Sequence, residues 1–251
     1  IIIGYFIGIG LLVFGMKLKT EYENYSSVLV SGGMTILYFI TYLGYSLYSL
    51  FPQLMAFGLM LVFIAFTVYA ALNYKKQIIA LLGLVGAYAV PFLLSTGSGR
   101  VDILFSYMAI LNLGILVISL TQNWRALFYS AFGLTWLIFC GWYLTDYNQD
   151  TQFIFAFVFL SLFFAIFYAT FIGYKLKYKM QFSRGDIIIL LFNSFIFFGM
   201  GYLMLSERSS MSDYLGLFTL INAVIHFLVS TAIYKLKLAD RNFFFLISDL
   251  F

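Results

Sequence analysis

The chain has 251 residues, of which 63% are hydrophobic and 10% are charged, with a formal net charge of +4. Water-soluble domains carry about 25% charged residues, so this composition excludes a soluble globular protein and predicts one that is surrounded by lipid. The basic residues lie between apolar runs instead of forming one patch, which argues against a nucleic-acid partner. With one histidine and one cysteine, the chain also lacks the donors for a conventional zinc site.

Long apolar runs follow one another along the chain, and a helix needs about 20 mostly apolar residues to cross the hydrocarbon. The runs cover residues 1–16, 26–48, 53–72, 78–94, 103–120, 126–144, 152–174, 186–205 and 214–234, and a tenth begins near Phe243. The links are short, so sequential helices are expected to pair as antiparallel hairpins. The predicted fold is an all-α, polytopic transmembrane bundle of nine spans plus the start of a tenth. Because the chain begins and ends inside apolar runs, we expect residues 1–251 to be a single transmembrane domain cut from a longer protein.

Lysines and arginines alternate strongly between the two sets of links. Of the 14 basic residues, only Arg100 and Arg208 lie in the links after the second, fourth, sixth and eighth runs. Basic residues favour the cytoplasmic side, so the Lys-rich links are predicted to be cytoplasmic and the 86–102 loop to face outward. The lysines end helices that run inward, where a cation suits the negative end of the helix dipole.

The run 26–48 carries a stripe of hydroxyl groups. The stripe residues are spaced by four, three, four, three and four residues, which places them on one helical face: Ser31, Thr35, Tyr38, Tyr42, Tyr45 and Ser49. One interpretation is the wall of a ligand path. The other is hydrogen bonding between helices, helped by close packing at Ser31-Gly32-Gly33.

Four polar residues lie near the middle of later runs: Asn112, Asn193, Asn222 and His226. Unpaired amide and imidazole groups are costly in hydrocarbon, so we expect all four to point into the bundle. They could line a polar pocket at the midplane, as in transporters, or bond to one another between helices.

The stretch from Gly86 to Asp102 joins two runs through a proline and a loop of small residues. Pro91 cannot donate to the Ala87 carbonyl, so the helix is expected to kink or end there. Small residues at 80, 83 and 87 favour close packing of that helix. The loop that follows is a candidate contact for an anionic head group or a plain exposed turn; its residues are Ser95, Thr96, Gly97, Ser98, Gly99 and Arg100.

The sequence contains no recognisable arrangement of catalytic residues. His226 is the sole histidine, and Asp186 stands at the mouth of a run, so a Ser-His-Asp triad has no buried carboxylate to orient the imidazole. The chain has neither a phosphate-binding Gly-rich loop with its lysine nor a His-Glu-x-x-His helix. We therefore expect no enzyme within these residues.

The segment 80–99, which reads ALLGLVGAYAVPFLLSTGSG, resembles the core of a family of bacterial membrane proteins, the domain-of-unknown-function family numbered 2339. Leu134-Thr135-Trp136-Leu137, Trp142-Tyr143 and Ser31-Gly32-Gly33 fit the same pattern. The resemblance implies a bacterial inner-membrane location and a longer parent chain with further spans. It implies no activity, because none is established for the family.

Together these features favour a non-enzymatic protein that binds or translocates a lipid-like or amphipathic small molecule. One alternative is a structural or assembly subunit of a membrane complex. Another is a membrane-embedded enzyme whose catalytic groups lie outside these residues. The expected partners are membrane lipids, with no cofactor, no metal and no nucleic acid.

Overall fold

The structure, a computed structural model, describes residues 1–93, 101–208 and 211–238. These described residues are helical apart from short links, and they contain no strand. The prediction of an all-α protein is therefore confirmed. The chain divides into two compact units: unit 1 comprises residues 1–104 with 124–131, and unit 2 comprises 105–123 with 132–251.

The helices follow the predicted apolar runs closely. They are α1 (Ile2–Lys17), η1 (Leu18–Thr20), α2 (Glu23–Ser46), α3 (Gln53–Tyr74), α4 (Gln77–Leu93), α5 (Val101–Ser119), α6 (Arg125–Thr145), α7 (Gln149–Tyr178), α8 (Arg184–Glu207), η2 (Ser212–Tyr214) and α9 (Leu215–Lys235). The largest difference is at the end of α7, which continues to Tyr178 instead of ending at 174. The extension adds about one turn to the helix, and its C-cap residue, Lys179, is in the left-handed conformation.

Eight helices within the described residues are long and apolar enough to cross a membrane when η1 is counted with α1 and η2 with α9. The exception is α4, which is apolar but has 17 residues. It runs through Pro91 and continues to Leu93, so the helix does not end at the proline. The tenth run predicted near Phe243 lies outside the described residues.

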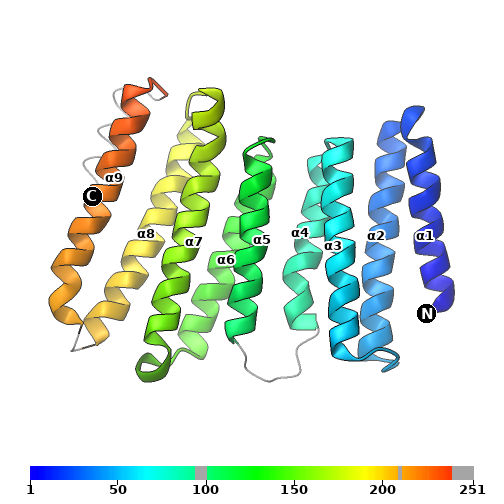
Figure 1. Ribbon diagram of the computed structural model, residues 1–251, viewed down its shortest axis with the longest axis horizontal. Helices are drawn as coiled ribbons and strands as arrows, with labels where there is room; N and C mark the ends of the chain where they lie inside the picture. The colour runs from blue at the N-terminus through cyan, green and yellow to red at the C-terminus, as the bar shows by residue number, and fades with distance from the viewer. Residues whose placement is uncertain (94–100, 209–210, 239–251) are drawn as a thin grey trace. The chain divides into compact units, whose positions relative to one another are not determined.

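Unit 1 is built on a close contact between α1 and α2, which lie side by side in Figure 1. A Cβ on Gly33 would lie 2.8 Å from the Gly8 carbonyl oxygen, and one on Gly8 would lie 2.7 Å from a Leu37 methyl carbon. Helices in lipid associate by packing and not by hydrophobic expulsion, so small residues at the contact let the backbones approach. The close packing expected at residues 31–33 is present at Gly33, whereas Gly32 faces open space.

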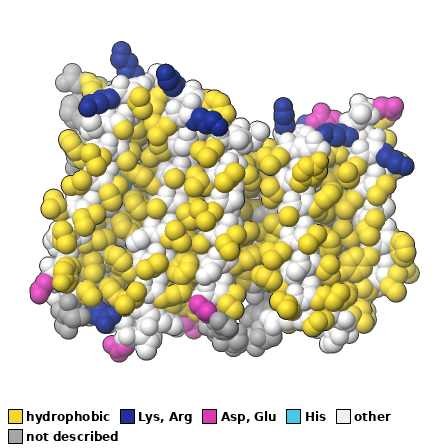
Figure 2. All heavy atoms as spheres, viewed as in Figure 1, with side chains coloured by type: hydrophobic (Ala, Val, Ile, Leu, Met, Phe, Trp, Pro, Cys, Tyr) yellow, Lys and Arg dark blue, Asp and Glu magenta, His cyan; other side chains and the backbone are white. Residues whose placement is uncertain are grey.

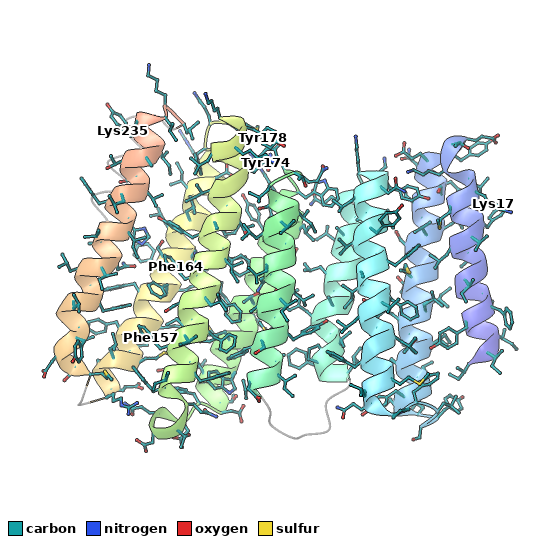
Figure 3. The ribbon with its side chains drawn as sticks, viewed as in Figure 1. Lys17, Phe157, Phe164, Tyr174, Tyr178 and Lys235 are labelled. Carbon is teal, nitrogen blue, oxygen red and sulfur yellow. The ribbon has the colours of Figure 1, made fainter. Side chains whose placement is uncertain are left out.

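The core of unit 2 is aromatic. The Phe105 ring contacts Phe139 at 5.2 Å and Phe163 at 5.9 Å between ring centroids, so α5, α6 and α7 meet around it. On α7, Phe164 stacks on Phe197 of α8 at 4.2 Å; Figure 3 labels Phe157 and Phe164 along this helix. Aromatic rings bury large areas and prefer edge or offset contacts, which explains how many phenylalanines pack here without clashes.

Lysines close the ends of several helices. In unit 1, Lys19 Nζ donates to the carbonyl oxygen of Asn73 in the last turn of α3 at 3.1 Å. In unit 2, Lys177 Nζ donates to the Leu120 carbonyl oxygen, just after α5, at 3.0 Å. Each lysine thus satisfies a carbonyl that the helix itself leaves open and places a cation at the negative end of the dipole. Figure 2 shows hydrophobic side chains along the helices and basic side chains gathered near helix ends.

Candidate functional site

Two residues of the hydroxyl stripe bond to their own helix, α2. Ser31 Oγ donates to the Ser27 carbonyl oxygen at 2.8 Å, and Thr35 Oγ1 donates to the Ser31 carbonyl oxygen at 3.0 Å. Hydroxyls bonded one turn back in this way are satisfied without a neighbouring helix or a ligand. They still form a weakly polar surface, because their oxygens can accept further hydrogen bonds.

Three of the six predicted stripe residues line a cavity of about 20 Å³ between α2, α3 and α4: Ser31, Thr35 and Tyr38. Thr67 of α3 and Gly83 of α4 complete the polar and small part of the wall. A cavity of this size holds about one water molecule. Tyr42 and Tyr45 lie further along α2, half-buried and outside this cavity. The prediction was wrong for Ser49, because α2 ends at Ser46.

Close packing around this cavity depends on α4. A Cβ on Gly83 would lie 2.7 Å from Thr67 Cγ2, and one on Gly86 would lie 3.1 Å from the Tyr38 ring. The small residues of α4 therefore let α2 and α3 approach, as their spacing predicted.

The mid-depth asparagines of α5 and α8 join helices. Asn112 Nδ2 donates to Thr135 Oγ1 of α6 at 3.0 Å. Asn193 accepts from Trp136 Nε1 at 3.2 Å and donates to the Phe164 carbonyl oxygen of α7 at 3.2 Å. Both residues are 0% exposed, so each amide is a buried link between helices.

The two polar residues of α9 lie in a different setting. His226 Nδ1 lies 2.9 Å from the Tyr168 hydroxyl of α7, and the imidazole also meets the Phe164 ring edge-on. Asn222, one turn earlier on the same face, is 2% exposed. Its side-chain oxygen accepts no hydrogen bond from any residue that the structure describes.

The structure thus brings Asn222 and His226 together on the buried face of α9, while Asn112 and Asn193 contact other partners. The candidate loop residues Ser95, Thr96, Gly97, Ser98, Gly99 and Arg100 lie outside the described residues. Within the described ranges, no group of three or more His, Cys, Asp or Glu side chains is placed to hold a metal ion.

The sequence analysis missed a buried ion pair between α7 and α8. Lys175 Nζ lies 2.7 Å from Asp186 Oδ2, and the two side chains are 4% and 9% exposed. Lys175 was expected in the link after the run 152–174; this was wrong, because α7 continues past it to Tyr178 and the chain turns back through residues 179–183. Tyr174 and Tyr178 mark this end of α7 in Figure 3.

Local sequence explains how Asp186 is held. Ser183 caps α8, and Asp186 Oδ2 accepts from the Ser183 backbone N–H at 2.8 Å and from its hydroxyl at 2.6 Å. Lys175 Nζ also donates to the Gln181 carbonyl oxygen at 2.9 Å. The signal that could have revealed the pair was Ser-x-x-Asp at a helix start, eleven residues after a lysine across a tight turn.

The number of long apolar helices places the chain among membrane proteins, and comparison of the sequence with protein families agrees. The profile of the family described as "Predicted membrane protein (DUF2339)" matches residues 1–243. The chain belongs to this family. No curated protein and no solved structure matches the DUF2339 chain.

Proposed function

We propose that this DUF2339 protein binds a lipid-like or amphipathic small molecule between its helices and passes it along the buried polar face of α9. The observation that supports the proposal is Asn222, whose amide oxygen is buried in the middle of α9 without a hydrogen-bond donor among the described residues. The other two candidate asparagine amides, on Asn112 and Asn193, both have hydrogen-bond partners in neighbouring helices.

An unpaired buried acceptor costs about 1–3 kcal/mol, and no water competes for it within hydrocarbon. A ligand that carries a hydroxyl or amine donor on an apolar body would supply the missing bond. His226 lies one turn further along the same face of α9, beside the Tyr168 hydroxyl of α7. These two groups provide the next polar contact for the ligand. The proposed ligand is therefore an amphiphile with a donor group, held at mid-depth.

We further propose that all nine helices cross the bacterial inner membrane as one domain, with α4 as the shortest span. A helix of 17 residues is about 25 Å long, a few ångströms short of a 30 Å hydrocarbon core. Local thinning of the bilayer accommodates such a mismatch at modest cost. In this arrangement the Lys-rich links are cytoplasmic and the 86–102 loop faces outward, as the basic-residue alternation predicts.

The experiment is native mass spectrometry of the full-length protein, extracted gently from its own membranes. A bound small molecule should be present in the wild type, lost in Asn222→Leu and retained in Thr219→Val. Thr219 is the matched control because it lies on α9, is exposed, and donates its hydroxyl to the Leu215 carbonyl oxygen. Equal retention by both variants would contradict the proposal.

The second candidate function is a structural or assembly subunit, and the bonds between helices favour it. In unit 1, the Ser26 hydroxyl donates to the Gly15 carbonyl oxygen at 2.5 Å and lies 2.7 Å from the Tyr74 hydroxyl, so one serine joins α1, α2 and α3. If the wild-type protein carries no small molecule and instead co-purifies with other membrane proteins in fixed ratio, this function replaces the first.

A further inference from the structure

One end of unit 2 holds two buried hydrogen-bond donors for which the structure provides no acceptor. The Trp142 side chain, near the end of α6, is 8% exposed, and Tyr147 lies in the turn between α6 and α7. Neither Trp142 Nε1 nor the Tyr147 hydroxyl has a hydrogen-bond partner within the described parts of the chain. The two rings meet edge-on at 5.7 Å between centroids, so the two donors belong to one cluster.

The surrounding rings hold both side chains in place. Trp142 meets the buried Phe105 ring edge-on at 5.0 Å, and Tyr147 stacks on Tyr143 at 4.6 Å. The Tyr143 hydroxyl, in contrast to its neighbours, has an acceptor in Glu207 Oε2 at 3.4 Å. The α6–α7 turn and the end of α8 therefore lie at the same end of unit 2.

Charged groups of both signs flank the cluster. The Arg208 guanidinium lies over the Phe153 ring, 4.9 Å from its centroid, and the Glu207 carboxylate is exposed. Burial raises the pKa of Tyr147, and Glu207 adds to the rise while Arg208 opposes it. Tyr147 therefore keeps its proton at neutral pH and can donate.

We propose that Trp142, Tyr147 and Arg208 bind the phosphodiester group of a zwitterionic phospholipid whose amine pairs with Glu207. The two neutral donors and the guanidinium match the oxygens of a phosphodiester, and hydrogen bonds to a charged acceptor are the strong ones. Helix ends are the depth at which head groups lie, and Trp and Tyr side chains are enriched there. The exposed Glu207 carboxylate favours a head group that carries an amine over one with net negative charge.

This site does not involve Asn222 or the buried face of α9, so its test is independent of the proposed function. Delipidated full-length protein in detergent is titrated with phosphatidylethanolamine, phosphatidylglycerol and inorganic phosphate in separate experiments. Wild type should bind phosphatidylethanolamine most tightly. Trp142→Phe and Tyr147→Phe, which keep an aromatic ring, should each weaken that binding about tenfold. The matched control is Tyr178→Phe, which removes an exposed hydroxyl at the opposite end of α7 and should leave the affinity unchanged.

Thermal unfolding of the delipidated protein supplies a second readout. If the Tyr147 hydroxyl lacks a protein acceptor, Tyr147→Phe removes an unsatisfied group, and the variant should be as stable as wild type or more stable. A clear fall in its unfolding temperature without lipid would overturn the proposal. So would unchanged phosphatidylethanolamine affinity in both variants. Equal binding of inorganic phosphate would show an anion site and contradict a lipid one.

Discussion

Gly33 is the position where one added methyl group should test the packing of unit 1 most directly. A Cβ there would lie 2.8 Å from the Gly8 carbonyl oxygen, whereas ordinary contacts begin at 3.4 Å, so α1 and α2 must separate by about 0.6 Å. The contact is with backbone, which no side-chain rotation relieves. Separation also loosens the contacts of Gly8 with Leu37 and of Gly15 with Val30 on either side.

The adjacent glycine provides the matched control for Gly33→Ala. A Cβ on Gly32 meets nothing within 4 Å. Both substitutions gain the same intrinsic helix preference of alanine over glycine, about 1 kcal/mol. The difference between the two variants therefore isolates the overpacking cost, which we expect to be about 1–3 kcal/mol against Gly33→Ala.

The assay is the free energy of unfolding in mixed micelles, measured for wild type, Gly32→Ala and Gly33→Ala under the same conditions. Gly32→Ala should equal or exceed wild type, and Gly33→Ala should fall below Gly32→Ala by the stated margin. If the two variants have the same free energy of unfolding, the close approach of α1 and α2 at Gly33 is wrong.

The remaining predictions concern the charged residues. Lys175→Met leaves the Asp186 carboxylate buried without its cation and should cost about 3–5 kcal/mol of unfolding free energy. The double variant with Asp186→Asn should recover most of that loss. If the stability losses of the two single variants simply add in the double variant, the coupling is refuted. Lys179 ends α7 with φ 51°, a conformation that costs a non-glycine residue about 1 kcal/mol, so Lys179→Gly should stabilise by that amount while Lys179→Ala, which keeps a Cβ, should not. With the single native cysteine replaced, an impermeant thiol reagent applied to intact cells should label Arg208→Cys and spare Lys76→Cys; the reverse pattern would invert the proposed orientation.

The helices of the fold could be predicted because lipid imposes a simple rule. A backbone in hydrocarbon must satisfy its own hydrogen bonds, so each long apolar run becomes one helix. Run length alone therefore predicted the nine described helices, and only the end of α7 moved by as much as four residues. The lysines were expected to end their own helices, whereas Lys19 and Lys177 donate to carbonyl oxygens at the ends of α3 and α5.

The candidate site was less predictable, since periodicity shows which residues share a face but not what that face meets. The hydroxyls of α2 do share a face, yet Ser31 and Thr35 donate to their own helix and only a water-sized cavity lies beside them. Asn193 and Asn222 are the same residue type, and each is buried within a long apolar helix. One has two partners, and the other accepts no bond from the described residues.

The sequence by itself determined that the protein lies in lipid, which segments form helices and roughly where each helix ends, because these follow from the apolarity of each segment alone. Only the tertiary structure decided that Gly33 touches another backbone while Gly32 does not, that Lys175 is buried beside Asp186, and that Trp142 and Tyr147 lie together. Each of these depends on how helices are rotated and paired. That is decided by side-chain packing between segments, which no single segment encodes.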